Sequence, residues 1–276
     1  MTLLDDLWDF SDPDLSESRF REALADDRFE RSEVLTQIAR TYSLRGRYPE
    51  ARHLLSEAER HPHSNRASVR ILLEIGRCHN SAGEKQHARC LFVQAWQAAL
   101  DLREDALAVD SAHMVAITHS GDPSLEWNRR ALALAEASLD PRARRWMASL
   151  HNNLGWVYHD DYRDYPRALV HFERSLAARA AQGDPEAVRI ARWAVARCLR
   201  SLGRHDQALE EQQRLLDEGG AGDGYVHEEI AECLVALGRE TEADPYFRQA
   251  YDLLSADPWF SQNEPDRLAR LQLASR

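Results

Sequence analysis

The sequence predicts an all-α protein, a solenoid of about six helical hairpins with a capping helix at each end. Three observations lead to this fold class. Six small residues, each in the middle of an apolar helical stretch, recur along the 276 residues at intervals of 35 to 43. Most of them are followed by a glycine and then by a second amphipathic stretch, as a chain of hairpins requires. Only 12 glycines and 10 prolines are present, too few for a β protein with many turns.

The first helix of each expected hairpin carries a small residue where it would face its partner helix. A side chain of this size lets the two helices approach closely. Stacking of neighbouring hairpins then buries the apolar faces that one hairpin leaves exposed. The small residues are Ala39, Gly76, Ala112, Gly155, Ala196 and Ala231.

A glycine follows five of these helices. We expect it to end the helix in the left-handed conformation, which costs glycine little because it has no Cβ atom. The glycines are Gly46, Gly83, Gly121, Gly203 and Gly238. The fourth hairpin has no glycine here and carries one extra residue in its turn, at residues 160–164.

The second helix opens with an alanine in five of the six hairpins, the third being the exception. A large apolar residue usually follows four positions later, where it fills the gap to the next hairpin. These alanines are Ala51, Ala88, Ala168, Ala208 and Ala243. The prolines support the same organisation, since six of the ten follow an aspartate. Aspartate at the N-cap with proline at the first helical position is a strong helix start.

Two segments carry the repeat most clearly. One is Leu154-Gly155-x2-Tyr158 followed by Ala168-x3-Phe172, and the other is Ile75-Gly76 followed by Ala88-x3-Phe92-x2-Ala95. They resemble the tetratricopeptide repeat, in the form of a bacterial protein made of such repeats throughout. The resemblance implies a right-handed superhelical solenoid that forms one domain over residues 1–276. Its repeats are expected near residues 32–65, 69–102, 105–138, 148–182, 189–221 and 224–257, with caps at 13–26 and 264–274.

Composition narrows the classes of function. A net charge of -11 and a pI near 5.6 disfavour binding to nucleic acid or to an anionic membrane surface. No run of about 18 apolar residues is present, and the acidic start of the chain lacks the basic and apolar parts of a secretory signal. The four cysteines form no CxxC pair and are too few for a disulfide framework. We therefore expect a cytoplasmic protein.

Signals for catalysis, cofactors and metals are absent or weak. No phosphate-binding loop, GxSxG elbow or HExxH pair occurs, and no Ser/His/Asp set stands out. His79 and His87 would face each other across one hairpin, with Cys78 and Cys90 beside them. Packing between hairpins is the better explanation for the cysteines, because one repeat position holds Cys78, Cys198 and Cys233. We therefore expect no enzyme activity, no cofactor and no metal site.

The resemblance implies that the inner face of the solenoid, lined by the first helices, binds the partner. The positions three before, one after and four after each small residue would point inward. Trp193, Arg197 and Arg200 share one stripe by this spacing, and Trp and Arg are the residue types that dominate binding hot spots. The candidate ligand-binding residues are Asn152, Trp156, His159, Trp193, Arg197, Arg200, Arg40, Arg77 and His113.

Two interpretations of the arginines remain open at this point. They either face a ligand that carries an acidic group, or pair internally with Glu228, Glu229 or Glu232 of the next hairpin. The function we expect is a non-enzymatic scaffold or adaptor that holds a protein or peptide segment, with an acidic group beside an apolar one, in the concave groove. The alternative is a signalling regulator that senses a peptide and changes curvature when the peptide binds.

Overall fold

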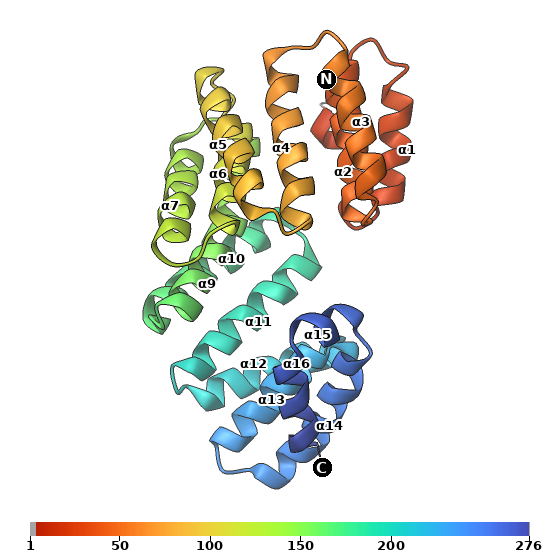
Figure 1. Cartoon of the computed structure of the whole chain (residues 1–276). Helices are drawn as coiled ribbons and strands as arrows, with labels where there is room; N and C mark the ends of the chain where they lie inside the picture. The colour runs from red at the N-terminus through yellow and green to blue at the C-terminus, as the bar shows by residue number, and fades with distance from the viewer. Residues whose placement is uncertain (1–3, 276) are drawn as a thin grey trace. The chain divides into compact units, whose positions relative to one another are not determined.

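The computed structural model describes residues 4–275, and within that range it contains helices joined by turns and no β-strand (Figure 1). The predicted all-α class is confirmed. The helices group into two compact units, Met1–Leu150 and His151–Arg276, each of which is described by itself. No helix among residues 4–275 is both long enough and apolar enough to cross a membrane.

Unit 1 is built of helical hairpins behind an N-terminal helix. Consecutive helices pack as pairs, α2 on α3, α4 on α5 and α6 on α7, and the first helices α2, α4 and α6 also touch in that order. Its elements are the 3₁₀ turn η1 (Leu4–Leu7), α1 (Pro13–Ala23), α2 (Arg31–Leu44), α3 (Tyr48–Arg60), α4 (Asn65–Ser81), α5 (Lys85–Asp101), α6 (Asp105–Ile117), α7 (Gly121–Ala137) and α8 (Pro141–Arg145).

Unit 2 repeats this arrangement, and the boundary between the units falls inside its first helix. Helix α10 packs on α11, α11 on α12, and α13 on α14, while the short helices α15 and α16 close the C-terminal end against α14. Its elements are α9 (Met147–Trp156), the π turn η2 (Val157–Asp161), α10 (Tyr165–Gln182), α11 (Pro185–Ser201), α12 (His205–Asp217), the 3₁₀ turn η3 (Gly220–Gly222), α13 (Gly224–Ala236), α14 (Glu240–Ser255), α15 (Pro258–Asn263) and α16 (Pro265–Ala274).

The paired helices come closest at the predicted small residues. A Cβ atom added at Gly76 would lie 2.4 Å from Cε1 of Phe92, and one added at Gly155 would lie 2.5 Å from Cε1 of Phe172. The other four positions hold alanines with no exposed surface, Ala39, Ala112, Ala196 and Ala231. The prediction that there is room only for a small residue is therefore confirmed at Gly76 and Gly155.

Four of the five predicted glycines end their helices in left-handed conformation. The φ angles of Gly46, Gly83, Gly203 and Gly238 lie between +72° and +81°, and each follows directly after the residue that caps its helix. Gly121 also has a left-handed φ, of 61°, but it is the first residue of α7, so the prediction that it ends the preceding helix is wrong.

Side-chain hydrogen bonds, and not a glycine, satisfy the carbonyl groups at the end of α6. The Thr118 hydroxyl donates to the Val115 carbonyl at 2.7 Å, and the Arg89 guanidinium donates to the Thr118 carbonyl at 2.9 Å. The terminal carbonyl groups of this helix are thus hydrogen-bonded without a left-handed glycine directly after the cap.

The extra residue of the fourth hairpin lies within a helix. Helix α9 continues into the π turn Val157–Asp161, in which hydrogen bonds span one more residue than in an α-helix. Arg163 follows with a φ of 52° and occupies the position that glycine holds in other hairpins. The longer turn predicted at residues 160–164 is therefore a widened last turn of the first helix.

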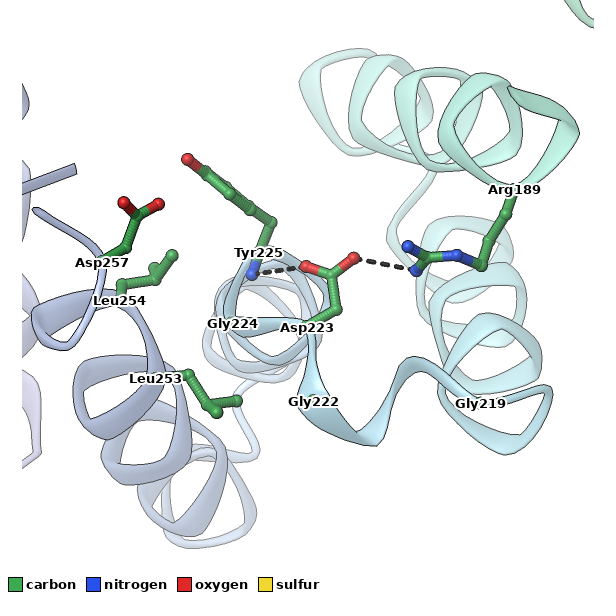
Figure 2. Close-up of a pocket in the computed structure, with 9 residues that line it drawn as sticks. All are labelled: Arg189, Gly219, Gly222, Asp223, Gly224, Tyr225, Leu253, Leu254 and Asp257. Carbon is green, nitrogen blue, oxygen red and sulfur yellow. Dashed lines mark hydrogen bonds and ion pairs between the residues drawn. The ribbon is translucent and has the colours of Figure 1, made fainter. Parts of the chain in front are cut away.

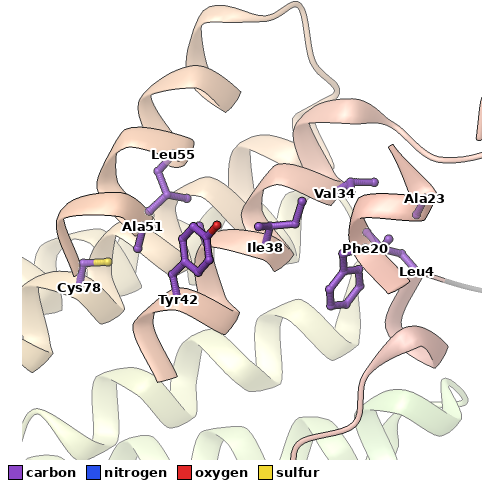
Figure 3. Packing of buried hydrophobic residues seen from close by; sticks show 10 residues of the cluster. Leu4, Phe20, Ala23, Val34, Ile38, Tyr42, Ala51, Leu55 and Cys78 are labelled. Carbon is purple, nitrogen blue, oxygen red and sulfur yellow. The ribbon is translucent and has the colours of Figure 1, made fainter. Parts of the chain in front are cut away.

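The core of unit 1 includes the N-terminal residues. Phe20 of α1 has no exposed surface and packs in one cluster with Val34 and Ile38 of α2 and with Leu4 of η1 (Figure 3). The same cluster continues along α2 and α3 to Tyr42 and Leu55. Helix α1 thus covers the apolar face that the first hairpin would otherwise leave open.

Candidate functional site

Aromatic side chains from three first helices form a row in unit 2. The ring centroid of Trp156 lies 6.0 Å from that of Trp193, which in turn lies 6.0 Å from that of Tyr225. Trp156 also meets Phe172 of α10 edge-on at 4.8 Å. We call Trp156, Trp193 and Tyr225 the aromatic row, and all three are half-buried. The structure thus brings two of the predicted residues together and adds a third.

A fixed repeat register cannot find Tyr225, because the row runs diagonally over the helices. Trp156 lies one position after its small residue, Trp193 three positions before, and Tyr225 six positions before. Each hairpin therefore shifts the row by about one helical turn, as helices that cross at an angle require. Aromatic residues that step back three or four positions per repeat are the sequence signal that would have revealed the row.

A pocket of about 340 Å³ opens beside this row, at the N-terminal parts of α11 and α13. Ile190, which is 55% exposed, forms an apolar wall with Trp193 and Tyr225. The Nε1 atom of Trp193 is buried and has no hydrogen-bond partner within the described part of the chain. A buried N–H group without an acceptor costs about 1–3 kcal/mol. An oxygen atom of a ligand that reached this nitrogen would remove that cost.

A second pocket of about 380 Å³ shares Arg189, Asp223 and Tyr225 with the first, and the glycine-rich connection before α13 and the end of α14 line the rest (Figure 2). Figure 2 shows the Arg189 guanidinium directed at the Asp223 carboxylate, with 2.9 Å between Nη1 and Oδ2. Asp223 also accepts from the backbone N–H of Tyr225 at 3.0 Å and so caps α13. Hydrogen bonds to Glu186 and Asp223 raise the pKa of Arg189, so the wall common to both pockets is held by a charged pair.

Arg197 and Arg200 both bind the carboxylate of Glu229 on α13. Arg197 Nη1 lies 2.5 Å from Oε1, while Arg200 donates to Oε2 at 2.7 Å and to Oε1 at 3.0 Å. Burial alone would raise the pKa of Glu229, but the two guanidinium groups hold it below its usual value. Internal pairing is therefore what the structure shows for these arginines, with Glu229 as the partner.

The other two glutamates considered as partners bind the C-terminal cap instead. Glu228 accepts from Arg267 Nε at 2.8 Å and from Arg270 Nη2 at 2.6 Å, and Glu232 pairs with Arg270. Pairing of Arg197 with Glu228 or Glu232 is thus wrong. Because two arginines share the single carboxylate of Glu229, this cluster keeps one surplus positive charge, and both arginine side chains remain about a quarter exposed.

His159 lies in the π turn and is buried. One ring nitrogen, Nδ1, is 2.6 Å from Oδ1 of Asp160, and the other, Nε2, is 2.9 Å from the hydroxyl of Ser201. This Ser–His–Asp order has the connectivity of a hydrolase triad, which the sequence did not indicate. Ser201, however, is the last residue of α11. The carbonyl end of a helix disfavours the oxyanion that acyl transfer would form there.

Asn152, another of the predicted binding residues, is half-buried on α9.

The predicted residues of unit 1 are also paired. Arg77 Nη1 lies 2.5 Å from Glu74, and Nη2 lies 2.5 Å from Asp110. Arg40 is 3.9 Å from Glu74. His113 lies beside Trp146, with 5.1 Å between ring centroids, and burial lowers its pKa to about 4. His113 is therefore neutral at physiological pH.

One group within the described residues could hold a metal ion. The ligand atoms of His79, Glu84 and His87 lie within 4.8 Å of one another at the turn between α4 and α5. Neither Cys78 nor Cys90 belongs to this group, and Cys78 is buried against the Ser43 hydroxyl, 3.3 Å from its sulfur. The structure thus joins the two histidines, as sequence spacing allowed, through a glutamate that the sequence did not single out.

Comparison of the chain with known protein families finds one match. The model of the tetratricopeptide repeat matches residues 36–106 and 158–224, together half of the chain. No curated protein sequence matches the chain.

Solved structures that resemble the chain contain the same repeat. A signal transduction ATPase with numerous domains and a tetratricopeptide repeat sensor, from Pyrococcus horikoshii, matches 95% of this chain and 44% of its own length, with a TM-score of 0.71 and 14% identity. The chain thus spans less than half of that protein. A tetratricopeptide repeat protein of Parabacteroides merdae has a TM-score of 0.53 and 14% identity, and covers 99% of this chain and 95% of its own. The C-terminal part of a repeat protein of Cytophaga hutchinsonii has a TM-score of 0.51 and 16% identity, over 92% and 95% of the two chains. At these identities the likeness shows the fold, an all-α solenoid.

Proposed function

The chain belongs to the tetratricopeptide repeat family, and from this premise we propose that it is a non-enzymatic scaffold that holds a protein or peptide segment against the first helices of unit 2. Proteins with this repeat generally serve as protein–protein interaction scaffolds. The site we propose is the Trp193 pocket, defined by Trp193, Ile190, Tyr225 and the charged residues Glu186, Arg189 and Asp223 that line it.

The buried Nε1 atom of Trp193 carries this proposal. A tryptophan N–H that is buried usually finds an acceptor. This one has none within the described residues, and the side chain that carries it lines a pocket. A backbone carbonyl or a carboxylate of a bound segment supplies the missing acceptor. Ile190 and Tyr225 then receive an apolar side chain of the same segment.

The charges that line the pocket sum to one negative, with Glu186 and Asp223 against Arg189, so the positive charge that favours an acidic group on the partner lies beside the pocket. Arg197 and Arg200 share one carboxylate and carry one surplus positive charge. The Arg197 guanidinium lies 5.6 Å from the centre of the Trp193 ring, so this charge adjoins the pocket. A segment with an acidic residue beside an apolar one matches both features, and charge complementarity speeds its association.

Free cysteines agree with a reducing compartment. Cys78, Cys198 and Cys233 are buried and unpaired, and burial raises the pKa of each thiol. Thiols of this kind are unreactive, so we propose that the scaffold works in the cytoplasm.

The experiment selects peptides from a displayed random library on the full chain and measures each one by fluorescence polarisation. Trp193→Phe removes the N–H group and keeps an aromatic ring. We expect selected peptides to pair an acidic residue with an apolar one, and to bind this variant about tenfold more weakly, as loss of one buried hydrogen bond implies. The matched control is Trp127→Phe in unit 1, where Trp127 packs on Trp96 and Arg130. Equal binding to wild type and Trp193→Phe would rule out the pocket.

A further inference from the structure

Residues 4–10 of the chain lie on the first helices of unit 1, where sequence reasoning placed only Arg40, Arg77 and His113. The Asp5 carboxylate accepts from Arg70 Nη2 of α4 at 2.7 Å, and Arg142 Nη1 of α8 lies 3.6 Å from the same carboxylate. The Trp8 indole donates to the Gln37 side chain of α2 at 2.9 Å. The segment thus touches α2, α4 and α8, helices that come far later in the chain.

Two aromatic rings of this segment cover Arg40. The rings of Trp8 and Phe10 stack with 4.6 Å between centroids and an interplanar angle of 1°. The Arg40 guanidinium carbon lies 5.5 Å from the Trp8 ring and 5.4 Å from the Phe10 ring. Arg40 is therefore in cation–π contact with both rings, and this contact occupies the residue that the sequence assigned to the inner face of the first hairpin.

The contacts separate into a core anchor and a surface contact. Leu4 is 6% exposed and belongs to the core cluster with Phe20. Phe10, in contrast, is 61% exposed, and the partly exposed carboxylate of Asp5 pairs with the buried Arg70 of α4 and with Arg142 of α8. Leu7 and Trp8 also pack against this cluster, and the Trp8 ring meets Phe20 edge-on with 5.1 Å between centroids. The contacts of Asp5 and Phe10 lie outside the cluster, with one carboxylate on two arginines and one ring on a third, as in a bound peptide.

We propose that Arg40, Arg70 and Arg142, here called the arginine face, form a recognition site for short segments that combine acidic and aromatic residues, and that residues 4–10 occupy it in cis. The segment Leu-Asp-Asp-Leu-Trp-Asp-Phe has three aspartates and no basic residue. A partner segment of the same chemistry binds when it displaces the chain's own. This inference rests on the proposed function, that the chain binds peptide segments, and adds a second site with its own ligand class.

The tether sets how well a partner competes. A segment joined to its site by a short linker has an effective concentration in the millimolar range. A free peptide therefore binds the wild-type chain weakly, and a variant without the cis contacts binds it strongly. This difference is the measurable sign of cis occupancy.

The test uses the full chain with Asp5→Asn, Trp8→Ser and Phe10→Ser together, which leaves the core anchor Leu4 in place. The probe is a fluorescent synthetic peptide with the sequence of residues 4–11, and binding is followed by polarisation. We expect the triple variant to bind the peptide at least about tenfold more tightly than wild type, because the tethered competitor is gone. A peptide in which the aspartates are replaced by asparagine should bind neither protein.

A further substitution in the triple variant identifies the face. Arg70→Gln should weaken peptide binding about tenfold, as loss of a charged hydrogen bond implies. Arg31→Gln is the control, since Arg31 pairs with Glu57 elsewhere on α2 and α3. A folded triple variant that does not bind the peptide, or that binds it regardless of Arg70, overturns the proposal.

Two controls test whether the variant still folds and whether the Trp193 pocket accounts for the binding. If the triple variant loses its helical circular dichroism, Asp5→Asn with Phe10→Ser is used, which keeps Trp8 against the core. Loss of fold in both variants overturns the proposal, because the segment is then core structure. Peptides selected on the Trp193 pocket distinguish the two proposals. If they bind the triple variant while the residue 4–11 peptide does not, this inference fails and the proposed function stands. If the peptides selected on the Trp193 pocket do not bind the wild-type chain either, the proposed function is contradicted, whatever the result with the residue 4–11 peptide.

Discussion

The phenyl ring of Phe172 occupies the space that a side chain at Gly155 would need, with its Cε1 2.5 Å from the position of a Cβ atom there. The same relationship holds between Phe92 and Gly76 one unit earlier, at 2.4 Å. In both hairpins the glycine lies in mid-helix, where it costs about 1 kcal/mol relative to alanine. The close approach of a ring to the backbone is what offsets that cost.

We therefore expect Gly155→Leu to destabilise the protein by about 1–3 kcal/mol or more, because added methylene groups force the Phe172 ring and its helix outward. Urea denaturation followed by circular dichroism measures the free energy of unfolding. Gly222→Ala is the control, since a Cβ atom there would meet nothing within 4 Å. A leucine variant as stable as wild type would show that the two helices are not in contact at this position.

The second prediction concerns the buried carboxylate of Glu229. Glu229→Gln should cost about 3 kcal/mol, at the low end for a broken buried ion pair, because Arg197 and Arg200 are about a quarter exposed and can be rehydrated. In a double-mutant cycle, coupling to Arg200 should exceed coupling to Arg197, since Arg200 donates two hydrogen bonds and Arg197 one. The exposed pair Arg214–Glu210 is the comparison, and its coupling should be at most about 0.5 kcal/mol. Equal coupling in the buried and exposed pairs would contradict the burial of Glu229.

The third prediction concerns pH. Burial lowers the pKa of His113 from 6.5 to about 4, and the charged groups that face it are Asp110, Arg77 and Arg40. Between these pH values the unfolded chain binds a proton at His113 that the folded chain does not. Stability from this residue is therefore complete above pH 6.5 and is lost as the pH falls towards 4.

The loss between pH 7 and pH 5 should be about 2 kcal/mol from His113 alone. The measurement compares the change in unfolding free energy between these pH values for wild type and His113→Asn. Since the variant has no titrating group here, its change should be smaller by that amount. The same change in both proteins would mean that His113 is solvated in the fold.

The fourth prediction concerns the C-terminal cap. Arg267 donates to both oxygens of the buried Glu228 and lies 5.4 Å from the ring centres of Tyr225 and Phe260. Arg267→Ala should therefore accelerate hydrogen exchange throughout α16, since local opening of a cap needs few contacts to break. Arg248→Ala, at an exposed position of α14, is the control and should leave α16 unchanged. Exchange in α16 that does not respond to Arg267→Ala would show that Leu271 and the ion pairs of Arg270 hold this helix without Arg267.

Local signals in the sequence predicted the hairpins well, because each is set by a few neighbouring residues. The left-handed glycines Gly46 and Gly203 follow directly from the chemistry of helix ends. The position of Tyr225 could not be predicted in the same way, because it depends on the angle at which α11 and α13 cross. The contact of Asp5 with Arg70 joins residues 65 positions apart, and no repeat period connects them.

The ion-pair partners of the arginines in the candidate site could also not be predicted from the sequence. The sequence placed Arg197 and Arg200 on one stripe correctly, and it proposed glutamates of the next hairpin as partners. It could not choose among Glu228, Glu229 and Glu232, because one residue along a helix turns a side chain by about 100°. Three-dimensional packing decided which of the three faces α11 and which faces α16.

The π turn at Val157–Asp161 has a consequence for how such repeat chains change over time. A one-residue insertion in an α-helix would rotate every later position of that helix by about 100°. Here the wide turn takes up the additional residue, and the next helix still presents Ala168 and Phe172 to the hairpin core. Length variation of one residue is thus absorbed where it arises, and neighbouring repeats can keep their packing surfaces while this one lengthens.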